Sequence, residues 1–194
     1  MAAKRVGVLA LQGDFDAHRK ALERAGAAVV PVRTAVELEG VEGLVIPGGE
    51  STTMLLILED EGLFDPLRRF AQQRPIFGTC AGAILVAAEV SHPAQASLGL
   101  MDIAVERNGY GRQLDSRVVW LEPSEPFLRE AGPGPLEAVF IRAPIIRRAG
   151  PETTVYLSCE GTPVLVGQGR HLVATFHPEL TADARVHKLF LERV

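Results

Sequence analysis

A cysteine flanked by glycines is the residue of this sequence best suited to covalent chemistry. Cys80 follows a short apolar run at residues 75–77 and precedes a predicted helix at residues 83–88. With Gly78 and Gly82 it forms a Gly-x-Cys-x-Gly pentapeptide, the spacing of a nucleophile elbow with sulfur in place of oxygen. A strand that turns sharply into a helix strains its apex residue and leaves no space for neighbouring Cβ atoms. The pattern predicts a thiol nucleophile at a helix N-terminus, which favours a thiolate; the alternative is a structural cysteine buried in a turn.

A histidine and a glutamate two positions apart could supply the base that such a thiol needs. The residue before a proline favours extended backbone angles, and His177 precedes Pro178. Positions two apart in an extended segment face the same side, so we expect Glu179 to orient the imidazole of His177. The alternative is a surface pair at a strand end. The other histidines lack such a setting and are expected to be solvated: His18, His92, His171 and His187.

Two adjacent glycines after a third apolar run could complete an oxyanion hole. Gly48 and Gly49 follow the predicted buried strand at residues 43–47. They would let a backbone N–H turn into the pocket as a second oxyanion donor, alongside the amide of Ala81. A tight strand-to-helix turn with Ser51 as N-cap explains the same residues, and both interpretations can hold. No Gly-Lys-Ser/Thr follows, so the segment is not a phosphate-binding loop.

Two arginines lie where later strands are predicted to end. Arg107 precedes a polar, glycine-containing loop, and Arg142 follows the apolar pair Phe140-Ile141. An arginine at either place could hold a substrate carboxylate through two parallel hydrogen bonds. From the local sequence, an exposed arginine with a loose ion pair is an equally good interpretation.

The elements that must position these residues alternate along the first half of the chain. Strands are predicted at residues 6–11, 28–32, 43–47 and 75–77, and helices at residues 15–25, 34–37, 54–58, 64–72 and 83–88. This alternation predicts a three-layer α/β fold with a mixed, mostly parallel central sheet and helices on both faces. Ligands bind beyond the carboxyl ends of such strands, where Gln12, Gly48-Gly49 and Cys80 are expected to lie.

The second half differs, because its predicted strands are short and separated by glycines and prolines. They fall at residues 101–107, 117–121, 138–142, 154–157, 164–167 and 172–176, and this spacing predicts antiparallel additions to the sheet. Residues 123–135 are predicted to form a loop-rich connection. Thr181 is the expected N-cap of a final helix that buries Val186, Leu189, Phe190 and Val194.

The bulk composition excludes several classes of protein. The 194 residues suit one domain, residues 1–194, and the net charge of −4 gives no basic surface for nucleic acid or an anionic membrane. No apolar run approaches the roughly 18 residues of a membrane span. The scattered histidines show no metal-ligand spacing, and two cysteines make no disulfide framework. A reducing cytoplasm is the expected location.

Motifs spread over nearly the whole chain make the sequence resemble the triad-type glutamine amidotransferases. The resemblance is closest to the family of glutaminase subunits of pyridoxal 5′-phosphate synthase. In order, the motifs are LALQGDF (residues 9–15), PGGESTT (47–53), GTCAG (78–82), RNGYGRQ (107–113), FIRAP (140–144) and FHPELT (176–181). One departure is Gly109, where the family pattern has alanine.

The resemblance implies hydrolysis of L-glutamine to glutamate and ammonia, with ammonia passed to a barrel-type synthase subunit that forms ring oligomers. It implies that Cys80 is the nucleophile, His177 the general base and acid, and Glu179 its orienter. The implied glutamine-binding residues are Gly49, Glu50, Ser51, Arg107, Ile141 and Arg142. The implied oxyanion donors are the amides of Gly49 and Ala81, and Gln12 would contact the synthase. The resemblance implies no cofactor, because pyridoxal 5′-phosphate would be the product of the complex.

Three other hypotheses for the function remain open at this point. One is the glutaminase of a different synthase, such as the one that makes imidazole glycerol phosphate. Another is a cysteine-bearing α/β protein of the redox-sensor or chaperone type, which would not need the His177–Glu179 pair. A third is a catalytically silent interaction subunit. For an active subunit we expect slow turnover without the synthase, because the Gly48-Gly49 peptide could turn away from the oxyanion position.

Overall fold

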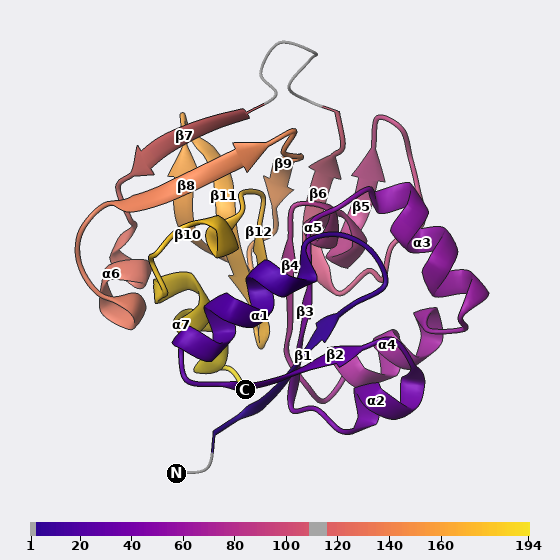
Figure 1. The fold of residues 1–194 in the computed structure, drawn as a ribbon. Helices are drawn as coiled ribbons and strands as arrows, with labels where there is room; N and C mark the ends of the chain where they lie inside the picture. The colour runs from indigo at the N-terminus through magenta and orange to yellow at the C-terminus, as the bar shows by residue number, and fades with distance from the viewer. Residues whose placement is uncertain (1–2, 109–115) are drawn as a thin grey trace.

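A central sheet of seven strands organises the molecule (Figure 1). The computed structural model describes residues 3–108 and 116–194. The strands of this sheet are β1 (Arg5–Leu9), β2 (Ala28–Val32), β3 (Gly43–Ile46), β4 (Ile76–Thr79), β10 (Thr154–Cys159), β11 (Thr162–Gln168) and β12 (His171–Ala174). Their order is β10-β11-β12-β4-β3-β1-β2. The pairs from β12 to β2 are parallel, whereas β10 and β11 add in antiparallel fashion.

Two smaller sheets flank the central one. The first contains β5 (Ala87–Ser91), β6 (Met101–Glu106) and β9 (Ile145–Ala149), and the second pairs β7 (Ser116–Leu121) with β8 (Leu136–Ile141). Most pairings in the later part of the chain are antiparallel, as predicted. The parallel pairings of β5 with β6 and of β12 with β4 are the exceptions.

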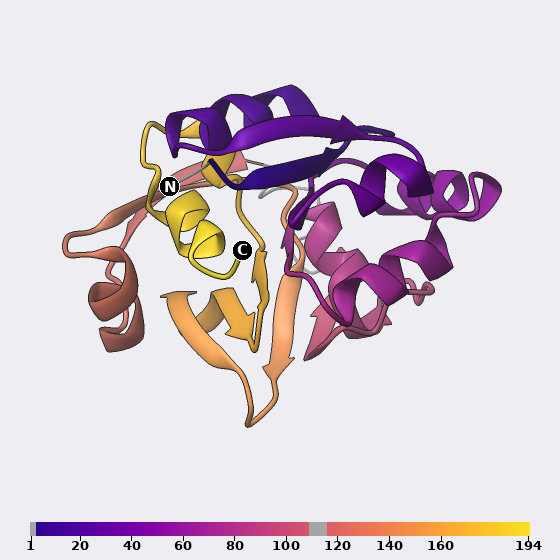
Figure 2. The same cartoon turned by 90° about the horizontal axis from the view of Figure 1, so that it is seen from below.

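Helices cover both faces of the central sheet (Figures 1 and 2). On one face lie α1 (Phe15–Arg24), α6 (Glu125–Ala131) and α7 (Arg185–Leu191). On the other lie α2 (Ala35–Glu39), α3 (Ser51–Asp60), α4 (Phe64–Ala71) and α5 (Ala81–Val86). Side chains alternate along a strand, so each buried strand feeds both cores. In β4, for example, Ile76 packs in one core and Phe77 in the other. The predicted three-layer α/β fold is confirmed.

Three local predictions are wrong. The segment predicted as a loop-rich connection contains α6, which begins after Ser124 and buries Phe127. The last helix begins at Arg185, with Ala184 rather than Thr181 in the N-cap position. The elbow helix is only six residues long, because the apolar residues after Val86 continue as β5 instead of a further helical turn. Short apolar runs do not by themselves distinguish helix from strand.

Within the described residues, no helix is both long and apolar enough to cross a membrane.

Candidate active site

Loops after adjacent parallel strands meet at the carboxyl edge of the central sheet. Gln12 follows β1, Gly48 follows β3, Cys80 follows β4 and His177 follows β12. A cleft of about 410 Å³ opens between these loops. The predicted site residues that line it are Gln12, Gly49, Glu50, Ser51, Cys80, Ala81, Arg107, Ile141, Arg142 and His177. Glu179 lies behind His177 in the protein interior.

The turn at Cys80 has the strained geometry predicted for a nucleophile elbow. Its backbone angles are φ 50° and ψ −106°, in a region that residues with a side chain rarely adopt. A Cβ on Gly82 would collide with the carbonyl oxygen of Ile46, and one on Gly78 would meet the carbonyl of Gly82. The Cys80 amide donates to the carbonyl of Ala174 on β12 at 2.8 Å. The glycines therefore allow the close packing that holds the thiol at the cleft.

His177 and Glu179 form the predicted pair, although the backbone between them differs from the expected one. Nδ1 of His177 lies 2.7 Å from Oε1 of Glu179. Pro178–Leu180 is a 3₁₀ helix, η1, and not an extended segment, so the prediction of contact is correct but its reason is wrong. The His177 amide donates to the carbonyl of Val139 at 2.8 Å, which fixes the start of this turn. The side chain of Glu179 is fully buried and that of His177 is 11% exposed.

The surroundings of His177 favour its charged form. Burial opposes protonation, but contacts with Cys80 and Glu179 outweigh it and raise the pKa of the imidazole to about 10. An imidazolium between a sulfur and a carboxylate is the arrangement of an activated cysteine–histidine pair. Such a pair can exchange a proton with a bound substrate or a water molecule.

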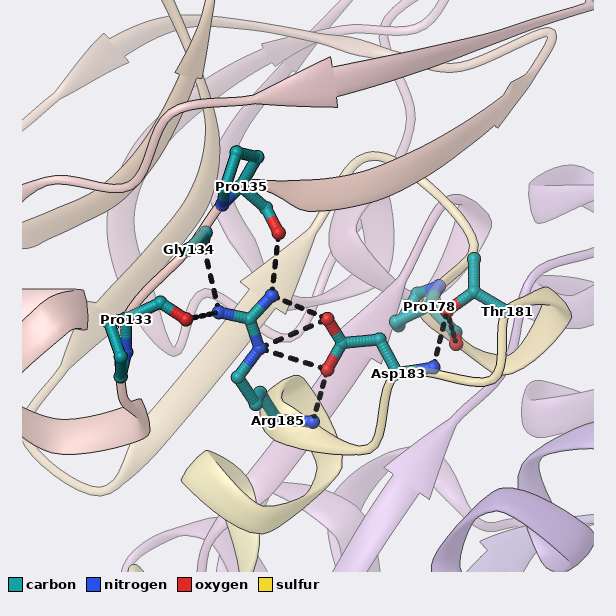
Figure 3. Close-up of polar contacts among 7 residues, drawn as sticks. All are labelled: Pro133, Gly134, Pro135, Pro178, Thr181, Asp183 and Arg185. Atoms are coloured by element: carbon teal, nitrogen blue, oxygen red, sulfur yellow. Dashed lines mark hydrogen bonds and ion pairs between the residues drawn. The ribbon is translucent and has the colours of Figure 1, made fainter.

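The segment that follows Glu179 is held by a set of polar contacts (Figure 3). The hydroxyl of Thr181 donates to the carbonyl of Pro178 at 3.3 Å and accepts from the amide of Asp183 at 3.3 Å. Arg185 pairs with the Asp183 carboxylate at 2.6 Å and donates to the carbonyls of residues 133–135. Thr181 thus closes the turn that carries His177 and does not cap the last helix.

The Gly48-Gly49 loop packs against both the base and Gln12. A Cβ on Gly48 would lie 2.6 Å from Cε1 of His177 and 3.3 Å from Cβ of Cys80. Gly49 has φ +156°, and a Cβ there would collide with Oε1 of Gln12. The same Gln12 oxygen accepts a hydrogen bond from the Glu50 amide at 3.1 Å. Larger residues would therefore not fit at either glycine, and Gln12 stabilises the observed loop conformation.

Glu50 and Ser51 are engaged within the protein as well as lining the cleft. The Glu50 carboxylate, not Ser51, is the N-cap of α3 and accepts from the amides of Thr52 and Thr53. The hydrogen bond from the Thr53 amide is the largest cause that lowers the pKa of Glu50 to about 2; desolvation opposes it and the Thr52 amide adds to it. The hydroxyl of Ser51 is buried and donates to Oε1 of Gln95 at 3.0 Å.

The two predicted arginines both line the cleft and differ in their contacts. Arg107 donates to Oγ1 of Thr52 at 2.7 Å and lies 3.4 Å from Glu50. Arg142 is exposed, forms no ion pair with any described residue, and has a positive φ of 43°. Next to it, the carbonyl oxygen of Ile141 lies 3.9 Å from Sγ of Cys80. The remainder of the RNGYGRQ motif, including Gly109, lies outside the described residues.

The prediction that the other histidines are solvated is wrong for three of them. His92 is exposed, but His18 and His187 are fully buried, and His171 is partly buried and accepts from the Ile76 amide at 3.2 Å. A signal for His18 was present, because Leu22 lies four positions later on the same helical stripe. The strip of charged residues beside it on α1 obscured that periodicity.

Among residues 3–108 and 116–194, no group of three or more histidine, cysteine, aspartate or glutamate side chains is arranged to hold a metal ion.

The fold and the site together define a class. A mostly parallel α/β sheet that carries a thiol elbow and a histidine–glutamate pair at its carboxyl edge is the architecture of a glutamine amidotransferase domain. A solved crystal structure described as a glutamine amidotransferase superposes with a TM-score of 0.88 at 45% identity, and the alignment covers 97% of each chain.

Sequence comparison gives the family. Residues 8–194 match the SNO glutamine amidotransferase family, and the chain belongs to it. A protein of Solibacter usitatus named "Pyridoxal 5'-phosphate synthase subunit PdxT" is 60% identical over 191 residues, which is 98% of this chain and 100% of that protein. A protein of Koribacter versatilis with the same name is 55% identical over 190 residues, 98% of this chain and 95% of that protein. The predicted family resemblance is confirmed, and the chain is an enzyme of the amidotransferase type.

Proposed function

We propose that this chain hydrolyses L-glutamine to L-glutamate and ammonia, with Cys80 as nucleophile. The observation that carries the proposal is the joint position of a thiol on a strained elbow and a histidine–glutamate pair joined at 2.7 Å, around one cleft. Membership of a glutamine amidotransferase family supports glutamine as the substrate. The raised pKa of His177 supports an imidazolium beside the thiol at neutral pH, ready to give its proton to the departing nitrogen.

The reaction proceeds in two halves. The Cys80 thiolate attacks the side-chain amide carbon of glutamine, and the amides of Gly49 and Ala81 stabilise the oxyanion that forms. The His177 imidazolium gives its proton to the departing nitrogen, so that the C–N bond breaks, ammonia leaves and a thioester remains. His177 then removes a proton from water, hydroxide attacks the thioester, and the C–S bond breaks to release glutamate. Glu179 keeps the imidazole in the correct tautomer and orientation throughout.

The rest of the cleft suits the amino-acid end of glutamine. Arg142 is a cation without an ion-pair partner among the described residues, and it suits the α-carboxylate. Glu50 remains ionised well below neutral pH, and it suits the α-ammonium group. Gly49, Ser51, Arg107 and Ile141 line the remaining surface.

We further propose that the ammonia passes to a synthase subunit that makes pyridoxal 5′-phosphate. The support is that the proteins from Solibacter usitatus and Koribacter versatilis are named as subunits of such a synthase. Gln12 lies at the cleft and holds the Glu50 amide, so a partner that contacts Gln12 would also act on the Gly48-Gly49 loop. This arrangement supports a partner-dependent oxyanion hole.

Replacement of the thiol tests the proposal directly. Cys80→Ala should abolish glutamate production, by at least about 10³-fold, while glutamine still binds in calorimetry, because the nucleophile is lost and the cleft is kept. Cys159→Ala is the matched control and should keep full turnover. Full activity of Cys80→Ala would refute the assignment. Glutamate production with and without added synthase subunit tests the partner proposal, which equal rates would contradict.

A further inference from the structure

The two carboxylate oxygens of Glu179 face different environments. Oε1 accepts from His177, whereas Oε2 points into the interior and has no hydrogen bond of regular geometry with any described residue. Nε2 of His18, a residue of α1, lies 3.3 Å from Oε2, and both side chains are fully buried. An ionised carboxylate without water needs hydrogen bonds at both oxygens. His18 is therefore the group next to the unsatisfied half of Glu179.

The contacts of His18 determine where its proton lies. Nε2 is also 2.9 Å from Oγ1 of Thr79, and Nδ1 is 3.2 Å from Nε2 of His187. Burial is the largest cause that lowers the pKa of His18 well below its ordinary value, and electrostatic effects of His187 and His177 add to it, so the ring is neutral and carries a single N–H. The proton must lie on one of the two nitrogens, and the neighbours decide which.

One tautomer satisfies the buried groups better than the other. With the proton on Nε2, His18 donates to Oγ1 of Thr79 and presents the same positive edge to Oε2 of Glu179, while its Nδ1 accepts from Nε2 of His187. Nδ1 of His187, which has no partner, is then a bare acceptor. With the proton on Nδ1, a lone pair of His18 would face the Glu179 carboxylate and His187 would carry a buried N–H without an acceptor. Both consequences are costly in a low-dielectric interior, so the first tautomer is favoured.

We propose that His18 is a positioning residue for the glutaminase reaction: its protonated Nε2, hydrogen-bonded to Thr79, faces the second oxygen of Glu179 at 3.3 Å and attracts it electrostatically, so that the first oxygen stays directed at His177. The inference rests on the proposed function, since it assigns His18 a part in the same reaction. The polar chain then runs from His187 through His18 and Glu179 to His177 and the cleft. Packing of α1 against η1 keeps the two sides of this chain together.

Turnover by three variants tests the role. His18→Leu should lower kcat by about 10- to 100-fold with little change in KM, by analogy with the loss of outer-shell partners in other sites. His18→Gln, whose amide can place an N–H near the same point, should recover most of the loss. His171→Leu removes a partly buried histidine at the other end of β12 and should keep kcat. An unchanged kcat in His18→Leu, or a loss that His18→Gln does not recover, would overturn the proposal.

A double-mutant cycle separates positioning from a general loss of structure. If His18 acts through Glu179, then His18→Leu should have almost no further effect on kcat in a Glu179→Gln background. If His18→Leu lowered kcat by the same factor in both backgrounds, the two residues would act independently, and the proposal would be contradicted.

The tautomer gives a readout that needs no turnover and no variant. Nitrogen-15 NMR of the histidine-labelled wild-type protein should show His18 protonated at Nε2, and protonation at Nδ1 would overturn the inference. If the wild-type chain with its synthase partner produced no glutamate, the proposed function would fail and the tautomer result would stand by itself. If the wild type is active and His18→Leu is equally active, only the further inference fails.

Discussion

Glu179 separates two regions of the molecule that each contain histidine next to its carboxylate. On the cleft side His177 lies 2.7 Å from one oxygen, and on the interior side His18 lies 3.3 Å from the other. The pKa of His177 is raised to about 10, whereas that of His18 is lowered well below its ordinary value. The same carboxylate thus neighbours one charged and one neutral imidazole.

The difference shows that a carboxylate alone does not fix the protonation of its neighbour. On the cleft side the contacts with Cys80 and Glu179 together exceed the desolvation cost of His177. On the interior side desolvation is the largest cause for His18, and the second buried histidine adds to it. One region is therefore suited to moving protons and the other to holding atoms in place.

Removal of the Glu179 charge, which lies between the two regions, should have the largest effect on turnover. Glu179→Gln should lower kcat by about 10²- to 10⁴-fold, because the imidazole of His177 loses its orienter. It should also lower the pKa of His177 from about 10, since one of the causes that raise it is gone. Steady-state rates measure the change in kcat, and an NMR titration of the His177 imidazole measures the change in its pKa.

Glu130→Gln is the control for that variant, because Glu130 lies on α6, accepts from Tyr156 of β10 and does not line the cleft. It should leave kcat and the titration unchanged. If Glu179→Gln kept wild-type kcat, the cleft-side interpretation would be wrong.

The two cysteines also differ between cleft and interior, and we expect a smaller effect here, on the reactivity of their thiols. Cys80 and Cys159 are equally buried, with 7% and 6% of each residue exposed, so burial alone predicts equal reactivity. Burial raises the pKa of Cys159, although Arg117 opposes this, whereas Cys80 lies at the cleft with His177. A glutamine-analogue electrophile should label Cys80 at least about 10²-fold faster than Cys159, as peptide mass spectrometry would measure. Equal labelling of both thiols would contradict a specific glutamine site.

The buried histidines should give the smallest effect, on stability. Burial, with a contribution from Arg24, lowers the pKa of His187 to about 4, whereas in the unfolded chain it is about 6.5. Below pH 6.5 the unfolded chain binds a proton that the folded chain excludes, so stability falls as pH falls towards 4. Between pH 7 and pH 5 this histidine should account for a loss of about 2 kcal/mol.

Urea unfolding of wild type and His187→Leu at both pH values measures that loss. The variant should be less sensitive to acid by about the same amount. An identical pH dependence of the two proteins would show that folding does not lower the pKa of His187. His177 affects stability in a different pH range. Its raised pKa stabilises the folded chain fully below pH 6.5, and this stabilisation is lost as pH rises through about 10.

Features that depend on local backbone rules could be predicted from the sequence. The glycines around Cys80 indicated the elbow, because only residues without a side chain fit that turn. Thr34 and Glu37 stand in the Thr-x-x-Glu spacing of a capping box, and their side chains form that box in the structure. Proline within a strand is typical of sheet edges, and β2, which contains Pro31, is an edge strand. The contact of His177 with Glu179 was predicted from spacing, but the 3₁₀ turn that makes it was not.

By itself the sequence determined which groups could react and which loops would carry them, because these depend on residue types a few positions apart. The tertiary structure alone decided which oxygen of Glu179 meets which histidine. His18 comes from the first helix and Glu179 from a turn near the other end of the chain, and packing of α1 on η1 brings them together. Burial, which no local pattern reports reliably, then makes one imidazole neutral while the cleft keeps the other charged.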